Sequence, residues 1–414
     1  MKWLKKIAFV WIAVCVIVAI AGCKTEQENA TEQTALTQSE EKPAYKKDPA
    51  NFVEFSRSTE PREVYVAVQD LLEYRSKYAE CNSTWFRDKL SGEDLLIYNS
   101  YLYALENRFT WFTVYVEDND KDFSYIREFV SLDSPFLEQN YSHYEQTFKQ
   151  PINYIGKRIS FSMEQFTDSR WEMKRQALSK CRQIVRSIPS QYKTQQAKME
   201  YLYDYVCDNV EYVEYENMAD ESYFYDAVCK GETICDGYSN MLLLLFRLIG
   251  VECCEVIAEG EEGKDGHTWV AAKLNGMFYN FDPTYEDTDQ NKTDKRVYFG
   301  FSDELVSMKS IMHEEFRPKC TNTSRDFNYA DIVVDSFTDK TDVKKIVKLA
   351  EERLTDGTKK TLVGVKDVVN EKEYNLFLDR VPLYARKSKS ISIAVYNMGK
   401  GTLVEITLTP RNGY

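Results

Sequence analysis

The sequence predicts an α+β protein in which a central helix is buried against an antiparallel sheet. The segment from Ser239 to Ile249 is apolar on almost every face, as expected of a helix at the centre of a domain. Alternating residues on both sides of Asn275-Gly276 then predict two strands joined by a two-residue turn. We expect a helical region before this core and a small α+β domain after it.

The first residues predict export from the cytoplasm. Three lysines precede an apolar run from Ile7 to Ala21, which is the order of a secretory signal. The run is shorter than the roughly 20 residues of a typical membrane-spanning helix. Cys23 follows Ile20-Ala21-Gly22, which resembles a bacterial lipoprotein cleavage site. We expect residues 1–22 to be a signal peptide and Cys23 to carry the lipid. An uncleaved membrane anchor is the alternative.

Residues 23–51 are expected to be a disordered tether behind the lipid. They contain almost no large apolar side chains and many Glu, Gln, Thr and Lys. Such a composition cannot bury enough surface to fold. A flexible chain of this length spans about 30 Å on average, so the body would stay close to the outer face of the bacterial cell membrane.

The composition of the chain excludes some functions. The formal net charge is −13 and no basic residues cluster, which argues against nucleic-acid binding. A hydrophobic content of 43% with 29% charged residues describes a soluble globular body.

Residues 52–189 are predicted to form a helical region. The runs at 62–81 and 91–112 both repeat apolar residues at spacings of three and four, and Ser91 is a plausible start for the second helix. Further helices are expected over 171–188 and 194–212. This region contains no cluster of polar residues that suggests a chemical role. We therefore interpret it as a scaffold or a substrate-binding surface.

Residues 325–414 are predicted to form a separate small α+β domain with the order β-α-β-α-β-β. Strands are expected over 330–337 and 361–368, with a helix over 342–354 between them. A short helix over 371–381 precedes a closing hairpin made by 390–399 and 401–410. This domain contains no recognisable motif.

Cys235 lies at the start of the buried helix, and Gly250 suits the left-handed position that ends such a helix. Unpaired N–H groups and the helix macrodipole favour an anion at the first turn. We therefore expect the pKa of the Cys235 thiol to be lowered, which would favour the nucleophilic thiolate. The same N–H groups could stabilise an oxyanion. A purely structural cysteine is the alternative.

The remaining cysteines leave the disulfide pattern open. The chain has ten cysteines, and Cys229, Cys253 and Cys254 could approach one another near the buried helix. No pair of zinc-ligand spacings is present. The acidic segment 285–294 lacks the glycine and the terminal glutamate of an EF-hand loop, so we interpret it as a solvated loop. We predict no metal and no cofactor.

The hairpin places His267 near a carboxylate. If Leu274 pairs with Met277, then Trp269 faces Asp282 and His267 faces Thr284. His267 and Asp282 then share one face of the sheet as diagonal neighbours, roughly 7–8 Å apart at the backbone. A carboxylate there can hold the imidazole in the useful tautomer.

The other two histidines of the chain, His143 and His313, have no carboxylate at a comparable defined spacing. We interpret both as surface or packing residues. His267 is therefore the candidate base for a cysteine nucleophile.

From about Tyr225 to Cys320 the sequence resembles the transglutaminase-like superfamily of papain-like fold. The resemblance is carried by "YDAVCKGETICDGYSNMLLLLFRLIGVEC", by "GHTWVAAKLNGMFYNFDPT" and by "YFGFSDELVSMKSIMHEEFRP". It implies a catalytic domain over 190–324 and the order nucleophile, base, orienting carboxylate.

The same resemblance implies roles for individual residues. Cys235 would be the nucleophile, His267 the acid–base and Asp282 the carboxylate that orients it. Tyr225 and Lys230 are candidates for a second oxyanion donor, which the motifs leave unassigned.

These observations support two hypotheses of function. The first is a cell-surface thiol-dependent acyl-transfer enzyme, which the resemblance favours as a cysteine protease or amidase-like hydrolase. It would act on peptide or isopeptide bonds of envelope proteins or wall peptides, and a glutamine cross-linking transglutaminase is its variant. The second is a non-catalytic surface-binding or assembly protein built on the same fold.

Overall fold

The computed structural model describes residues 49–57, 60–117, 121–137, 146–149, 157–162, 168–213, 223–260, 266–288 and 296–411. The predicted signal peptide, Cys23 and nearly all of the tether lie outside these residues, as does His143. By its contacts, the segment Asp48–Tyr414 forms one compact unit. None of its described helices combines the length and the apolar character needed to cross a bilayer.

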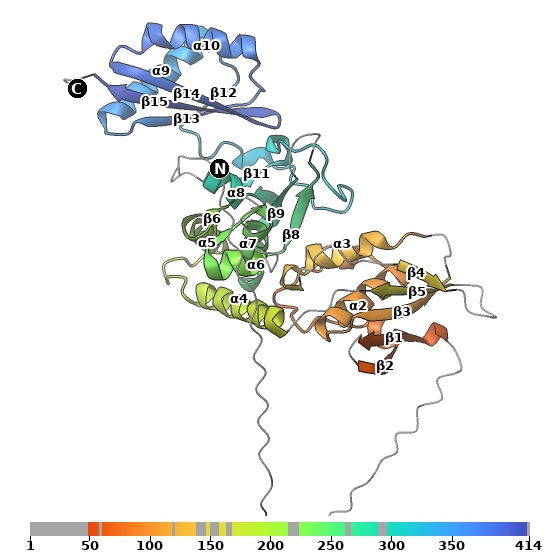
Figure 1. The fold of residues 1–414 in the computed structure, drawn as a ribbon. Coiled ribbons are helices and arrows are strands. Elements are labelled where there is room, and N and C mark those ends of the chain that lie inside the picture. The colour runs from red at the N-terminus through yellow and green to blue at the C-terminus, as the bar shows by residue number, and fades with distance from the viewer. Residues whose placement is uncertain are drawn as a thin grey trace, which may run out of the picture. The chain divides into compact units, whose positions relative to one another are not determined.

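Between residues 52 and 189 the structure contains a sheet, so the expectation of a purely helical region is wrong (Figure 1). The antiparallel strands follow the order β2-β1-β3-β5-β4. They are β1 (Phe52–Arg57), β2 (Glu60–Ala67), β3 (Trp111–Val116), β4 (Gln146–Lys149) and β5 (Lys157–Ser162). The helices here are α1 (Val68–Leu72), α2 (Gly92–Glu106), α3 (Ser124–Asp133) and α4 (Asp168–Arg186).

The helical prediction is wrong for the first residues of the run 62–81, which form a strand. Val64 and Val66 pair with Phe55 and Val53 of β1, and Tyr65 between them is 43% exposed. This is the two-residue period of a strand, and β-branched residues suit a pleated surface. The apolar spacing is therefore helical only after Ala67, where α1 begins.

The central part of the chain forms the predicted core of a helix on an antiparallel sheet. The sheet has the order β11-β10-β9-β8. Its strands are β8 (Cys253–Ala258), β9 (His267–Leu274), β10 (Met277–Phe281) and β11 (Phe299–Phe301). The helices are α5 (Gln195–Asn209), α6 (Tyr223–Tyr225), α7 (Cys235–Leu248) and α8 (Pro283–Thr288), with a π-helical turn at Asp226–Lys230 and a short parallel pair β6 (Glu211–Tyr212) and β7 (Glu232–Thr233).

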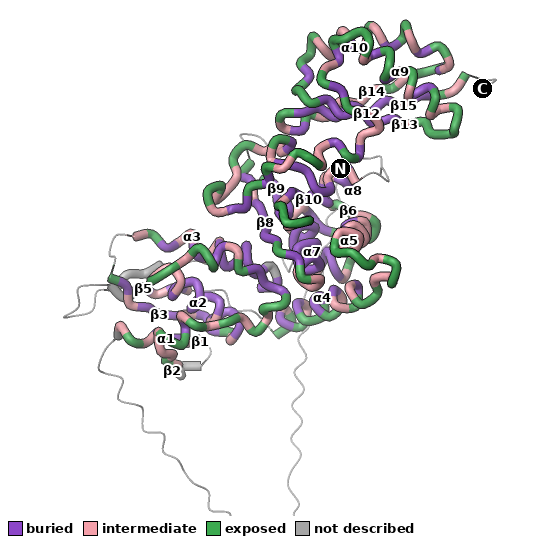
Figure 2. The backbone as a smooth tube through the Cα atoms, turned by 180° about the vertical axis from the view of Figure 1, so that it is seen from behind, coloured by how far each residue is buried: buried purple, intermediate pink, exposed green. Residues whose placement is uncertain are grey.

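Helix α7 is buried along most of its length, as its apolar sequence predicts. Every residue from Gly237 to Phe246 is buried, and Figure 2 shows the helix in the colour of buried residues. Its end at Gly250 has φ +78°, the expected left-handed conformation. At its start, a Cβ on Gly237 would lie 2.6 Å from the Tyr223 carbonyl oxygen and closer still to the Thr233 hydroxyl. Only glycine fits there.

The last part of the chain has the predicted order of elements. It contains β12 (Ile332–Val334), α9 (Lys340–Thr355), β13 (Lys360–Val365), α10 (Glu371–Tyr384), β14 (Ser388–Met398) and β15 (Gly401–Pro410). The sheet order is β12-β13-β15-β14, and only β12 and β13 are parallel. The domain boundaries themselves stay predictions.

Buried apolar side chains form one large cluster and two smaller ones. The large cluster extends from Val53 to Cys320, so the N-terminal sheet and the α7 core share a continuous interior. A second cluster belongs to the last domain. A third joins residues 297–329 to Leu362, Met398 and Leu403, and so connects the core to the β13–β15 sheet.

We predict that Gly237→Ala destabilises the protein. In an ordinary helix interior, replacing glycine with alanine stabilises by about 0.5–1 kcal/mol. The added methyl group here would meet backbone and hydroxyl oxygens, and such overpacking costs about 1–3 kcal/mol. Urea unfolding should show a lower midpoint with an unchanged slope. A raised midpoint would contradict the close packing of the first turn of α7.

Candidate active site

The hairpin that carries the candidate base has the predicted register. Met277 pairs with Leu274, and the ladder continues to Phe281 opposite Val270. Asn275 and Gly276 have φ values of 51° and 85°, as a type I′ turn requires. The ladder ends one pair earlier than expected, because the Asp282 N–H donates to the Tyr298 carbonyl and α8 begins at the next residue.

His267 and Asp282 meet as predicted. The His267 Nε2 atom lies 2.7 Å from the Asp282 Oδ2 atom, and the two residues are only 7% and 2% exposed. The Asp282 Oδ1 atom accepts from the backbone N–H of Tyr285 at 3.1 Å. The carboxylate is thus held by the first turn of α8 while it orients the imidazole. Nδ1 of His267 has no hydrogen-bond partner among the described residues.

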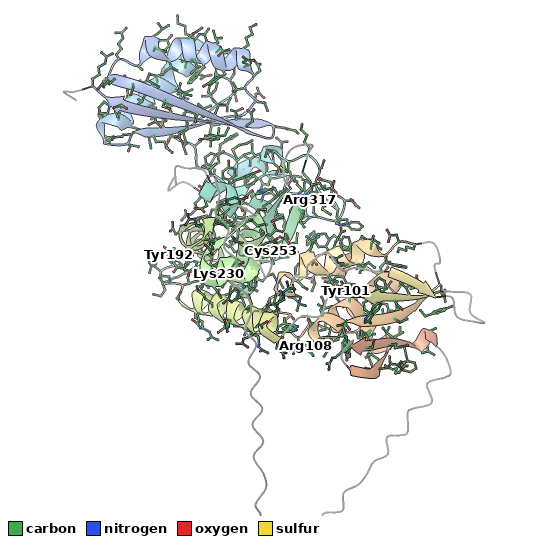
Figure 3. The ribbon with its side chains drawn as sticks, in the orientation of Figure 1. Tyr101, Arg108, Tyr192, Lys230, Cys253 and Arg317 are labelled. Atoms are coloured by element: carbon green, nitrogen blue, oxygen red, sulfur yellow. The ribbon has the colours of Figure 1, made fainter. Side chains whose placement is uncertain are left out.

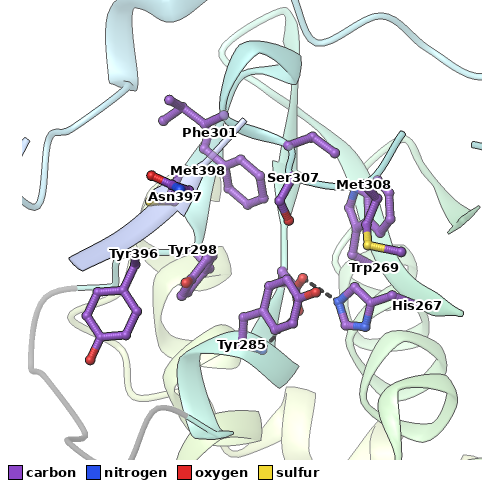
Figure 4. A pocket seen from close by; sticks show the side chains of 13 residues that line it. His267, Trp269, Tyr285, Tyr298, Phe301, Ser307, Met308, Tyr396, Asn397 and Met398 are labelled. Carbon is purple, nitrogen blue, oxygen red and sulfur yellow. Dashed lines mark hydrogen bonds and ion pairs between the residues drawn. The ribbon is translucent and has the colours of Figure 1, made fainter. Parts of the chain in front are cut away.

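Two aromatic rings flank the imidazole (Figure 4). The Tyr285 ring stacks on His267 with centroids 4.2 Å apart and planes 12° apart. The Trp269 ring lies 5.9 Å away at 24°, and its Nε1–H donates to Asn280 at 2.9 Å. These rings restrict rotation of the imidazole, so its plane is set by packing as well as by Asp282.

Tyr285 was not predicted to belong to the site, because it begins the acidic segment 285–294, which is interpreted from the sequence as a solvated loop. Pro283 is favoured at the first position of a helix, and Tyr285 lies two residues later. Recognising that start would have placed Tyr285 next to Asp282. Nothing local to the sequence indicated its stacking on the imidazole.

Cys235 is the first residue of α7 and lies beside the strand that carries His267. Its thiol donates to the Asp236 carboxylate at 3.5 Å, and the backbone of Thr268 lies near enough to influence the thiol pKa. One turn further along α7, the hydroxyls of Ser239 and Thr268 are 2.8 Å apart. The start of α7 is therefore attached to the residue adjacent to His267.

The expectation of a lowered thiol pKa is wrong for this structure. Burial is the main effect, and it raises the pKa of Cys235 well above the usual thiol range. The neighbouring Asp236 raises it further, while the hydrogen bond from Thr268 offsets only part of this. Burial also raises the pKa of Asp236. Because its pKa is raised and not lowered, Cys235 is expected to rest as a neutral thiol.

The remaining candidates lie away from this cluster. The His313 Nε2 atom contacts the Glu128 Oε2 atom at 2.5 Å and packs on Phe129. Lys230 forms an ion pair with Asp226 at 2.7 Å. None of the eight cysteines in the described part of the chain, from Cys81 to Cys320, forms a disulfide bond. Within that part, no three His, Cys, Asp or Glu side chains gather to hold a metal.

The comparisons with known proteins support the fold. Residues 182–283 match the family model of the transglutaminase-like superfamily, which confirms the resemblance and the α+β core. This match includes Cys235, His267, Asp282 and the hairpin. No curated protein matches the chain.

The solved structures that resemble part of this chain include the following three. One is a TGase at 13% identity, covering 45% of this chain and 54% of its own, with a TM-score of 0.25. Another is a candidate cysteine protease from Cytophaga hutchinsonii at 12% identity, covering 34% and 62%, with a TM-score of 0.21. The third is the periplasmic domain of TgpA from Pseudomonas aeruginosa at 11% identity, covering 42% and 69%, with a TM-score of 0.22. The chain thus spans about half the length of the first structure.

We predict that alkylation of Cys235 by iodoacetamide is slow at pH 6 and accelerates with pH. Only the thiolate reacts, and its fraction rises about tenfold per pH unit while the pH is below the pKa. A raised pKa therefore extends this rise beyond pH 8. Peptide mass mapping would give the rate at each pH, with the half-buried Cys229 as the reference thiol. A rate that is constant from pH 5 to 8 would indicate a resting thiolate and contradict the prediction.

Proposed function

We propose that this chain, whose residues 182–283 match the transglutaminase-like superfamily, is a thiol-dependent acyl-transfer enzyme of the cell envelope. We infer that it hydrolyses peptide or isopeptide amide bonds in envelope proteins or wall peptides. The observation that carries the proposal is the 2.7 Å contact between His267 and Asp282, formed next to Thr268, whose hydroxyl donates to Ser239 one turn after Cys235 in α7.

The proposed reaction begins with proton transfer from Cys235 to His267. Asp282 occupies Nε2, so Nδ1 is the ring nitrogen that accepts the thiol proton. The sulfur attacks the amide carbon, and the C–N bond breaks as His267 returns the proton to the departing amine. A thioester remains on Cys235. Water then attacks the thioester, which releases a carboxylic acid and restores the thiol.

Stabilisation of the oxyanion would come from the start of α7. The N–H groups of Gly237 and Tyr238 already donate to the Ile234 carbonyl at 3.1 and 3.3 Å. The N–H of Cys235 itself, which precedes them, is therefore the donor we assign to the oxyanion. Because the thiol is protonated at rest, its deprotonation by His267 is coupled to attack on the bound substrate.

Two alternatives have a basis in the same site. If an amine replaces water in the second half-reaction, the product is a cross-link between substrates. The half-buried Cys235 thiol, whose pKa is raised by desolvation, favours a second candidate function, a non-catalytic surface-binding protein on the same fold. Cross-linking differs from hydrolysis in the fate of the thioester. The binding function differs from both because no thioester forms.

We predict that incubation with cell-envelope peptides leaves an acyl group on Cys235. Rapid acid quenching followed by mass spectrometry would detect it and give its mass. Cys235→Ala and His267→Ala should abolish the adduct, since they remove the nucleophile and the base. Asp282→Asn should slow its formation by about 10²–10⁴-fold, because the imidazole loses the partner that orients it.

Cys229→Ala is the matched control, since it removes another thiol close in sequence but outside the site. It should leave the adduct unchanged. If no envelope fraction yields an adduct on wild-type protein, the binding function is favoured. An adduct that survives His267→Ala would rule out the proposed base.

The proposed location has its own prediction. Cys23→Ser should abolish incorporation of labelled palmitate in cells and release the protein from membranes, because the thioether to the lipid cannot form. Cys15→Ser, which lies within the predicted signal peptide, should leave lipid labelling intact. Equal labelling of the Cys23→Ser protein would contradict the lipid anchor.

A further inference from the structure

A pocket of about 220 Å³ opens beside His267 and Asp282 (Figure 4). Most of its lining is aromatic or aliphatic, and it contains no lysine or arginine. The lining comes from three parts of the chain that are far apart in sequence. The core contributes His267, Asp282 and the aromatic rings beside them, the segment after β10 contributes six residues between 298 and 308, and the end of β14 contributes residues 396–398.

The wall formed by residues 302–312, here called the wall segment, is anchored at its first end. The Ser302 hydroxyl donates to Asp326 at 2.6 Å. Asp303 accepts from the buried Arg317 at 2.8 Å and from Asn280 at 3.1 Å; Arg317 is labelled in Figure 3. Asn280 also receives the Trp269 indole N–H, so this network leads back to the ring beside His267.

The wall segment is also anchored at its other end. The Ser310 carbonyl accepts from the Glu259 N–H at 2.8 Å, and the Met312 N–H donates to Ile257 at 2.9 Å. These bonds lie at the edge of β8. Val306, Ser307 and Met308 run past the pocket between the two anchored ends, so their position is set by the fold.

The turn between β14 and β15 docks on this wall segment through its backbone. The Lys400 N–H donates to the Glu304 carbonyl at 2.6 Å. Gly399 has φ +56°, and a Cβ there would lie 2.5 Å from the Val306 carbonyl oxygen and nearer to that of Glu304. Contact this close requires glycine. Met398 packs with Leu305 in the small third cluster, so the end of β14 is held against the pocket.

We propose that this pocket binds one aromatic or large aliphatic side chain of the peptide substrate, and that the last domain thereby sets side-chain selectivity. This inference rests on the proposed function. The pocket is smaller than the roughly 300–1,000 Å³ of sites for drug-sized ligands, which suits a single side chain. Its apolar lining disfavours a charged side chain, because the carboxylate of Asp282 in the lining is already paired with His267 and the lining contains no lysine or arginine.

Because the pocket lies next to His267, we expect the side chain that it binds to change the rate of the reaction. His267 itself lines the pocket, so a side chain bound there lies next to the imidazole that is proposed to transfer the proton. Each methylene group placed in an apolar pocket changes the specificity ratio by about 10–200-fold. Phe or Leu at the matching substrate position should therefore outperform Ala by at least about tenfold, and Asp and Lys should be poorest.

The test uses the full chain with peptidyl acyloxymethyl ketones, which alkylate an activated thiol. The probes differ only in one of the two residues nearest the reactive group, with Phe, Leu, Ala, Asp or Lys in that position. The second-order rate of labelling at Cys235 is measured by mass. In the wild-type protein, Phe or Leu should exceed Ala by at least about tenfold at one of the two positions.

Two variants and a control locate the source of the selectivity. Tyr396→Ala removes part of the pocket wall, and Gly399→Val prevents the turn from docking, so both should reduce the Phe-to-Ala ratio at least about threefold. Leu383→Ala changes a side chain of the same domain that is 65% exposed and outside the pocket, and should leave the ratio unchanged. Circular dichroism and the unfolding midpoint would verify that each variant is folded.

The outcomes separate this inference from the proposed function. Equal rates for all wild-type probes, or a ratio unaffected by folded Tyr396→Ala, would overturn the pocket assignment. If probe labelling of Cys235 is the same in His267→Ala as in the wild type, the proposed enzyme fails instead. Labelling that depends on His267 but not on the side chain would retain the enzyme and reject the pocket.

Discussion

The site depends on the attachment of the first turn of α7 to strand β9. Thr268 makes this attachment through its hydroxyl, which donates to Ser239 at 2.8 Å. Because His267 is the neighbouring residue on the strand, this contact places the first turns of α7 next to the strand residue that carries the imidazole. Gly237 permits a second close contact of this turn, with the segment before α7, where any side chain would collide with Thr233 and the Tyr223 carbonyl.

Burial determines the chemistry that the site can perform at rest. Desolvation keeps Cys235 protonated, and the adjacent Asp236 adds to this effect. His267 and Asp282 are also buried, yet each has a partner in the other, and Asp282 additionally accepts a backbone hydrogen bond. Buried polar groups with partners are stable, and an orienting pair with a neutral thiol beside it avoids an isolated buried charge.

The pocket next to this pair is assembled from segments that the chain brings together only on folding. The wall segment is anchored to Asn280 and Asp326, and the β14–β15 turn is docked on it by backbone contact. A domain without a chemical motif of its own therefore contributes to the surroundings of the candidate base. Its effect is exerted through shape and apolar surface, and the reactive groups come from the core.

Local sequence patterns determined the α7 core, the hairpin register and the meeting of His267 with Asp282. Each follows from short-range rules: an apolar helix must be buried, and a two-residue turn fixes which residues face one another. Only the tertiary structure decided the raised pKa of Cys235, the stacking of Tyr285 and the pocket wall from Tyr396 to Met398. Desolvation and packing depend on atoms distant in sequence, which local periodicity does not specify. The sheet within residues 52–162 was missed for a related reason, since its strands gain stability from partners up to 59 residues away, as Glu54 is from Thr113.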